Sequence, residues 1–159
     1  MRVLIVSDTH GRHSNLIEAL DMVQPVDLLV HLGDVEGGED EIRLLAECPV
    51  EIVAGNNDFF SDLPRETSVQ IGRYRVLLTH GHYYAVNAGI MGIAEEAAAR
   101  GYDMVMFGHT HRPVIVEEKG VTVINPGSIS YPRQEGRKPS FILMETDQKG
   151  EAHFELEYL

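Results

Sequence analysis

The chain has 159 residues, of which 43% are hydrophobic and 24% charged, and this composition is that of a globular protein long enough to bury a core. Its formal net charge of −12 argues against a broad duplex-DNA surface, because such surfaces are basic. One cysteine, Cys48, excludes an intrachain disulfide, and no apolar run approaches the roughly 20 residues that cross a bilayer. We therefore expect a single domain over 1–159 that is cytoplasmic and makes no contact with a membrane.

The first 58 residues alternate between short apolar runs and helical patterns. Apolar side chains at helical spacing predict one helix that ends near Val23, with Ser14 as its N-cap, and a second over 39–47. His31 lies inside an apolar run and is expected to be a hydrogen-bonded core histidine. This β-α-β-α-β order predicts a parallel sheet with right-handed crossovers. The predicted strands, rich in β-branched residues, are 2–7, 27–32 and 50–54.

From residue 67 the pattern changes to strand pairs joined by tight turns, with a third helix over 90–97 that Gly101 terminates. Together with the first half this gives about ten strands and three substantial helices. We expect an α/β fold in which two sheets face each other and the helices lie outside. The strands predicted here are 67–71, 73–79, 103–107, 114–117, 121–124, 141–145 and 152–158.

Side chains of the kind that bind metals follow five of the predicted strands. Sites in such sheets form beyond the carboxyl ends of the strands, so we expect these side chains to lie together. Imidazole, carboxylate and amide donors suit divalent Mn, Fe, Zn or Ni. Seven donors exceed the needs of one catalytic ion, which must keep positions open for water and substrate. The seven are Asp8, His10, Asp34, Asn56, His80, His109 and His111.

In chain order these motifs read D-x-H, G-D, G-N-x-D, H-G-H and G-H-x-H. This order resembles the signature of the calcineurin-like metallophosphoesterase superfamily, in its small YfcE-type form, and the resemblance extends from Asp8 to the Asn-Pro-Gly-Ser turn at 125–128. It implies an α-β-β-α sandwich and a dinuclear metal-dependent phosphodiesterase. In that chemistry a hydroxide that bridges two metal ions attacks a small phosphodiester.

The resemblance also implies which residues hold each ion, with the two ions roughly 3.5–4 Å apart. Mn is the expected metal, with Fe, Zn or Ni as alternatives. Two divalent ions would outweigh the charge of the two carboxylates, so the site could accept an anion within an acidic protein. The implied ligands are Asp8, His10 and His111 for the first ion, Asn56, His80 and His109 for the second, and Asp34 as the bridge.

Many members of the family read G-N-H followed by Asp or Glu, and that His is thought to help protonate the leaving group. Here the position is Asn57, whose amide can donate a hydrogen bond to a phosphoryl oxygen but cannot deliver a proton. We take Asn57, Asp58 and His82 as candidate catalytic residues, and Arg12 and Asn57 as candidate substrate-binding residues. We expect Asp58 to orient a ligand or Asn57, with a helical or turn cap as the structural alternative. An ordinary solvated histidine is the alternative for His82.

Two other functions are open to this fold. The small subunit of the retromer coat uses it as a protein-interaction scaffold, and larger relatives are nucleases. Scaffolds have degraded ligand sets, whereas all seven positions here carry competent ligands. The chain has no room for the extra regions of the nucleases and no basic stripe, so nucleic acid is not the expected partner. We expect a small phosphodiester as substrate, and exposed strand pairs would allow a homodimer or homotetramer.

Overall fold

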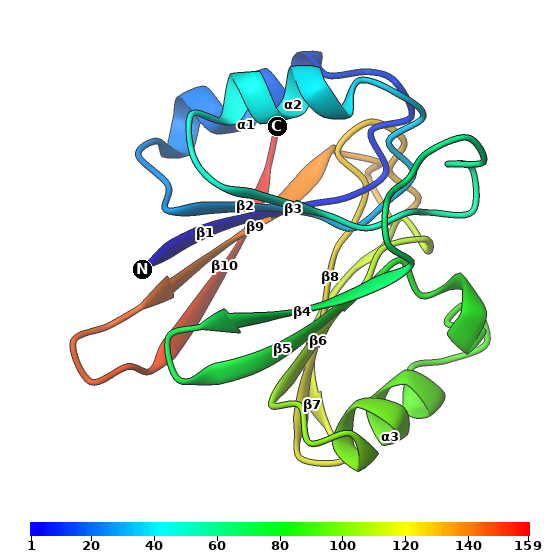
Figure 1. Ribbon diagram of the computed structural model, residues 1–159, viewed down its shortest axis with the longest axis vertical. Helices are drawn as coiled ribbons and strands as arrows, with labels where there is room; N and C mark the ends of the chain where they lie inside the picture. Colours follow the sequence, from blue (N-terminus) through cyan, green and yellow to red (C-terminus); the bar gives the residue numbers. More distant parts are fainter.

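The computed structural model describes all 159 residues and contains ten strands, three α-helices and one short 3₁₀ helix (Figure 1). None of the helices has the length and apolar character needed to cross a bilayer. In chain order the elements are β1 (Arg2–Val6), α1 (Ser14–Val23), β2 (Leu28–His31), α2 (Glu39–Ala46), β3 (Val50–Ile52), β4 (Glu66–Ile71), β5 (Tyr74–Thr79), η1 (His82–Tyr84), α3 (Met91–Ala99), β6 (Met104–Met106), β7 (Pro113–Glu118), β8 (Val121–Pro126), β9 (Ser140–Thr146) and β10 (Ala152–Tyr158).

The strands form two five-stranded sheets, as predicted. The first has the order β10-β9-β1-β2-β3 and the second the order β4-β5-β6-β8-β7. In each sheet three strands run parallel, β1, β2 and β3 in the first and β5, β6 and β8 in the second, while the other strands pair antiparallel. Figure 1 shows α1 and α2 on the outer face of the first sheet and α3 on the outer face of the second.

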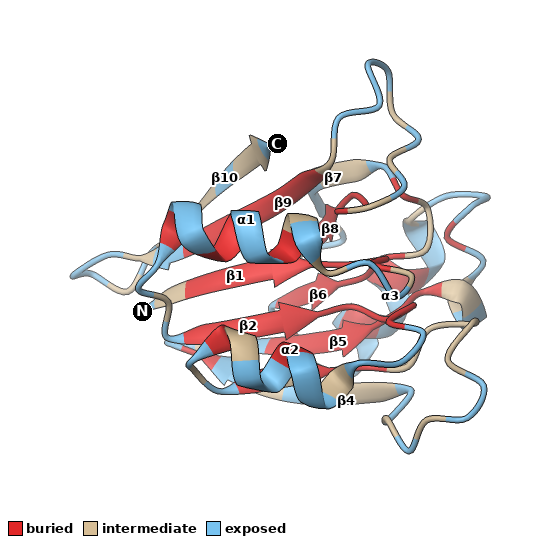
Figure 2. Cartoon of the chain, turned by 90° about the horizontal axis from the view of Figure 1, so that it is seen from above, coloured by how far each residue is buried: buried red, intermediate tan, exposed pale blue.

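Strand β1 shows why the sequences of the parallel strands are continuous apolar runs. Val3 and Ile5 point into the core between the sheets, whereas Leu4 and Val6 point into the core beneath α1 and α2, and all four are fully buried. Burying each such side chain contributes about 1.5–3 kcal/mol. Figure 2 shows these central strands buried, and the edge strands β4 and β10 only partly so.

The start of α1 differs from the prediction. The carbonyl of His13 accepts the first intrahelical bond, from the amide of Ile17, so His13 is the N-cap and Ser14 lies within the helix. The His13 side chain makes no capping bond because it turns toward α2, where its Nδ1 lies 3.3 Å from Oε2 of Glu41. At the end of α3, Gly101 adopts the left-handed conformation that the sequence predicts.

His31 is confirmed as a hydrogen-bonded core histidine. Its Nδ1 accepts a bond from the Gly33 amide at 3.2 Å, so Nε2 carries the proton and donates to Oγ1 of Thr9 at 3.1 Å. The side chain is fully buried, and this burial lowers the pKa of His31 to about 4. The folded protein therefore holds His31 neutral, while the unfolded chain can protonate it below its ordinary pKa of 6.5.

This difference predicts a loss of stability in mild acid. Below the unfolded pKa the unfolded state binds more protons, so the free energy of unfolding falls as the pH drops toward the folded value. We expect His31 to contribute a decrease of about 2 kcal/mol between pH 7.5 and pH 5. Denaturant unfolding of wild type and His31→Gln in chelator measures it, because glutamine can keep both hydrogen bonds without titrating. An equal pH dependence in the two proteins would contradict the assignment.

Candidate metal centre

The loops that follow the buried strands are tied to one another by backbone hydrogen bonds. The amide of Asp8 donates to the carbonyl of Gly33 at 3.0 Å, and the amide of His10 donates to the carbonyl of Asp34 at 2.9 Å. Between the two sheets, the amide of Ile129, after β8, donates to the carbonyl of Ser7, after β1, at 3.1 Å. Strand ends from both sheets therefore meet at one end of the sandwich, as expected from the parallel topology.

Backbone strain is concentrated in these loops. Five of the ten non-glycine residues with positive φ are predicted ligands. Such conformations cost of order 1–3 kcal/mol each and persist where the surrounding structure holds them for a functional reason. The five are Asp8, His10, Asp34, His109 and His111, with φ between 48° and 68°.

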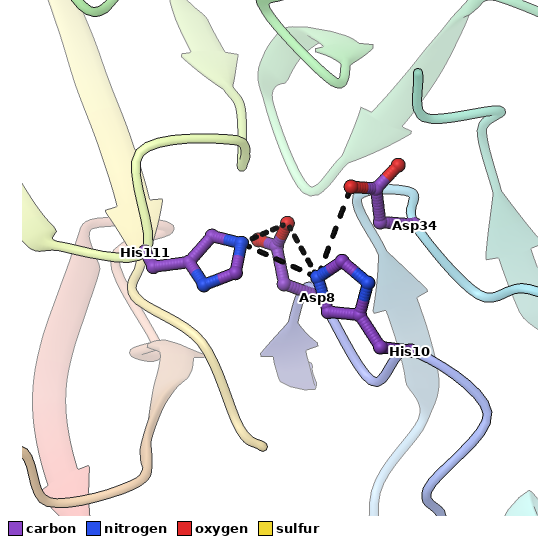
Figure 3. Close-up of side chains that lie close together, drawn as sticks. All are labelled: Asp8, His10, Asp34 and His111. Atoms are coloured by element: carbon purple, nitrogen blue, oxygen red, sulfur yellow. Dashed lines mark hydrogen bonds and ion pairs between the residues drawn. The ribbon is translucent and has the colours of Figure 1, made fainter. Parts of the chain in front are cut away.

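The first group of predicted ligands is brought together. Asp8, His10, Asp34 and His111 offer donor atoms that all lie within 4.8 Å of one another (Figure 3). The Nε2 atoms of His10 and His111 are 3.3 Å apart, and Nε2 of His111 is 3.1 Å from Oδ1 of Asp8. These separations are short enough for the side-chain atoms to coordinate one metal ion.

The tautomers of two of these histidines are set from outside the group. Nδ1 of His111 donates to the carbonyl of Tyr131 at 2.6 Å, and Nδ1 of His10 is 2.6 Å from Oε1 of Glu36. With Nδ1 protonated in each neutral ring, the lone pair lies on Nε2 and points into the group. This arrangement of a carbonyl or carboxylate behind the imidazole is typical of metal-binding histidines.

Asp8 supplies the test of whether a cation fits here. Its side chain is fully buried, and neither carboxylate oxygen has a hydrogen-bond partner. Nε2 of His111 is near Oδ1 but is not aligned to donate to it. A buried, ionised carboxylate without partners costs several kcal/mol. A divalent cation between Asp8 and the facing imidazoles removes that cost, so the residues present fit a metal ion.

The second group of predicted ligands lies against the first. Oδ1 of Asn56 is 3.1 Å from Nε2 of His80 and 2.8 Å from Nδ1 of His109. Nδ1 of His80 donates to the carbonyl of Leu32 at 2.6 Å, which leaves its Nε2 as an acceptor that faces the amide oxygen of Asn56. Oδ2 of Asp34 is 3.6 Å from that same Nε2, so Asp34 touches both groups.

The electrostatic field at this position favours cations. Burial alone would raise the pKa of Asp34, but His80 and the hydrogen bonds from Asn57 outweigh it and hold that pKa well below its ordinary value. Burial alone would lower the pKa of His80, but Asp34 and the charge of Asp8 outweigh it and raise that pKa. The carboxylate of Asp34 is thus ionised near neutral pH and attracts positive charge.

The side chain of Asn57 bonds to Asp34, and its expected contact with the substrate stays a prediction. Its backbone amide donates to Oδ1 of Asp34 at 2.9 Å, and its Nδ2 donates to Oδ2 at 2.8 Å. Both carboxylate oxygens are therefore held in one orientation between the two groups. A phosphoryl contact would require Nδ2 to exchange this partner for the substrate or to offer its second hydrogen.

Asp58, the other catalytic candidate of this loop, does not reach the centre. Its carboxylate accepts hydrogen bonds from the backbone amides of Gly55 at 2.7 Å, Glu36 at 2.7 Å and Val35 at 3.3 Å. These bonds join the loop after β2 to the loop after β3. Asp58 therefore fixes the backbone of the loop that carries Asn57, and its expected role in orienting a ligand or Asn57 stays a prediction.

His82 and Arg12 lie on opposite sides of the centre. The His82 ring is half-buried, 5.4 Å from the His80 ring and 6.0 Å from the His109 ring, and its buried Nδ1 has no partner. Burial lowers the pKa of His82. The Arg12 guanidinium is exposed and lies 4.9 Å from the centre of the Tyr131 ring. The predicted roles of both side chains stay predictions.

Several residues that contact the predicted ligands were not predicted from the sequence. Glu36 behind His10 could have been found, since it follows Asp34 by two positions. Asn87, whose Nδ2 is 2.9 Å from Nε2 of His109, comes from a loop with no ligand-like pattern. The turn at 125–128 does support the site, because Nδ2 of Asn125 donates to the carbonyl of Gly108 at 2.7 Å.

With the centre described, comparison with known proteins shows the family. The sequence profile described as "Calcineurin-like phosphoesterase superfamily domain" matches residues 1–149, and the chain belongs to this superfamily. It is similar to a probable metallophosphoesterase of Bacillus subtilis, at 37% identity over 84% of this chain and 78% of the relative. It is also similar to a phosphodiesterase of Methanocaldococcus jannaschii, at 32% identity over 80% of this chain and 83% of the relative. The predicted family is confirmed.

Solved structures agree with this placement. A predicted phosphoesterase of Streptococcus pneumoniae superposes with a TM-score of 0.82 at 30% identity, covering 99% of this chain and 88% of the other. Vps29 of Entamoeba histolytica, in a complex with zinc, superposes with a TM-score of 0.79 at 23% identity over 99% of both chains. The second likeness concerns the fold alone. The predicted α-β-β-α sandwich is confirmed.

Gly55 provides a test of how closely the loop after β3 must approach Asp34 in the loop after β2. A Cβ atom at this position would lie 2.1 Å from Oδ1 and 2.2 Å from the backbone nitrogen of Asp34, so Gly55→Ala must displace Asp34. We expect this displacement to weaken metal binding by about 10- to 100-fold in calorimetric titration with Mn²⁺, the size of effect that supporting residues have in metal sites. Gly92→Ala is the control, because the nearest atom to its Cβ would be 3.8 Å away. Unchanged affinity in Gly55→Ala would show that Asp34 is not a ligand.

Proposed function

We propose that this protein is a phosphodiesterase that binds two divalent transition-metal ions and hydrolyses a small phosphodiester. The observation that carries the proposal is the wholly buried, partnerless carboxylate of Asp8 among converging imidazole, amide and carboxylate donors. The proposed ligands are Asp8, His10 and His111 for one ion, Asn56, His80 and His109 for the other, and Asp34 for both.

The position of Asp34 supports two ions rather than one. Its Oδ2 is 3.8 Å from Nε2 of His10 in the first group and 3.6 Å from Nε2 of His80 in the second. Asn57 holds both of its oxygens in place from the side. A carboxylate fixed between two sets of ligands is the arrangement that a bridging residue needs. Oxygen and imidazole donors without thiolates favour Mn, with Fe, Zn or Ni as alternatives.

When bound, such ions neutralise the charge of the phosphoryl group and lower the pKa of a water molecule toward neutrality. The chain supplies orientation and proton transfer. Asp34 is held by two hydrogen bonds from Asn57, so little reorganisation of this carboxylate is needed during the reaction. His82 borders the second group, and we assign to its protonated form the proton that the leaving group requires. Asn57 cannot fill this role because an amide does not donate a proton near neutral pH.

The relatives favour a diester over a monoester as substrate. The similar protein of Methanocaldococcus jannaschii is named a phosphodiesterase. The net charge of −12 disfavours duplex nucleic acid, so we propose a small diester rather than a polymer. The same complete set of donors argues against a scaffold, which has no need to keep an unpartnered carboxylate buried.

The test compares bis(p-nitrophenyl) phosphate with p-nitrophenyl phosphate, using protein loaded with Mn²⁺. We expect kcat/KM for the diester to exceed that for the monoester by about tenfold or more, and Asp34→Asn to lose most of the activity. His153→Ala is the control, because His153 is exposed and bonds only to Asp147. Preference for the monoester, or full activity in excess chelator, would contradict the proposal.

The same assay tests the assignment of His82. Removing a general acid typically costs about 10²–10⁴-fold, and the cost grows as the leaving group becomes more basic. We expect His82→Ala to slow esters of alkyl alcohols far more than p-nitrophenyl esters. A loss of equal size for all leaving groups would show that His82 does not supply the proton.

A further inference from the structure

An open cleft of about 820 Å³ borders the first group of ligands. His10 and His111 form its inner wall, and three arginines, Arg112, Arg133 and Arg137, line it farther out. The volume lies within the range of sites for small ligands. Since two proposed metal ligands form the inner wall, anything that fills the cleft lies directly against the centre.

The three arginines have no internal partners. None of their guanidinium groups takes part in a hydrogen bond or an ion pair, although the chain has 25 acidic residues. The one carboxylate that lines the cleft, Glu36, is bonded to His10. Three of the other seven arginines do pair with carboxylates: Arg2 with Glu145, Arg73 with Glu151, and Arg100 with Glu66.

Tyr131 lines the same cleft and lies beside His10. Its ring lies 5.1 Å from the ring of His10, at an interplanar angle of 88°, and the Arg12 guanidinium lies 4.9 Å from the centre of the ring. The Tyr131 hydroxyl forms no hydrogen bond within the protein and is free to donate one. The cleft thus offers a phenol beside the centre and three guanidinium groups beyond it.

Three unpaired guanidinium groups in one cleft are chemically matched to a phosphate. Each guanidinium presents N–H donors in a planar fork that fits phosphate oxygens, and such charge-assisted bonds are stronger than neutral ones. A local cluster of positive charge in an acidic protein also directs an anion to this one place. The dianionic end of a phosphate monoester would satisfy donors that the protein itself leaves unused.

We propose that this cleft binds a second phosphate of the substrate, one that is not hydrolysed. This inference rests on the proposed function, because the scissile diester must occupy the neighbouring centre. It defines the substrate class as a small phosphodiester that carries a terminal phosphate monoester, such as a nucleotide diester with a further phosphate on its sugar. Arg112, Arg133 and Arg137 are the residues that determine this specificity.

The test uses two chromogenic esters that differ only in the second phosphate: the 5′-p-nitrophenyl ester of thymidine 5′-phosphate, with and without a 3′-phosphate. We expect the wild-type, metal-loaded protein to prefer the 3′-phosphorylated ester by about tenfold or more in kcat/KM. In Arg112→Ala and Arg133→Ala the ratio of the two values should fall toward one. The preference should also shrink at high salt, because the arginines are exposed.

Lys138→Ala is the matched control, since Lys138 lies in the same loop and carries the same charge but does not line the cleft. It should keep the preference of the wild type. The inference is overturned if the wild type shows no preference, if the arginine variants keep it, or if Lys138→Ala loses it equally.

A separate binding measurement distinguishes this inference from the proposed function. If the metal-loaded protein hydrolyses neither nucleotide ester nor bis(p-nitrophenyl) phosphate, the proposed function fails. Calorimetry then decides the role of the cleft. Binding of thymidine 3′,5′-bisphosphate about tenfold tighter than thymidine 5′-monophosphate, with the difference lost in Arg133→Ala, supports the inference. Equal binding of the two nucleotides overturns it.

Discussion

The buried carboxylate of Asp8 is the constraint on which the rest of this structure depends. It is removed from solvent with both oxygens unpartnered, a state that is stable only when cations compensate its charge. Under the proposed function, metal ions held by the surrounding loops supply that compensation. His10 and His111 turn the lone pairs of their Nε2 atoms toward Asp8, because Glu36 and the Tyr131 carbonyl occupy the other ring nitrogens.

The same constraint explains why backbone packs so closely at this end of the sandwich. A Cβ atom at Gly108 would lie 2.0 Å from Oγ of Ser7 and 3.0 Å from Oδ2 of Asp8, so only glycine lets the loops of the two sheets meet. Negative and positive charges also lie on different parts of the molecule. The acidic surface keeps anions away in general, while the arginine-lined cleft admits them at one side of the centre.

The sequence predicted the strands, their pairing into two sheets and the convergence of the ligand-type residues, because buried parallel strands are continuous apolar runs whose carboxyl ends share one edge. It could not predict contacts that depend on loop conformation. Asn57 donates to the carboxylate of Asp34, and residue order does not show which acceptor its amide takes. The N-cap of α1 is His13 rather than the predicted Ser14. The His13 side chain contacts Glu41 and makes no capping hydrogen bond, so capping preferences do not indicate it. The supporting residue Asn87 likewise comes from a loop with no recognisable pattern.

The most direct test of the account is the position of metal ions in crystals of the protein grown with Mn²⁺. Anomalous diffraction measured on both sides of the Mn absorption edge locates the ions without assumptions about the ligands. The account predicts two sites, one among Asp8, His10 and His111 and one among Asn56, His80 and His109, with Asp34 in contact with both. A single Mn site, or Mn bound only away from Asp8, would contradict it.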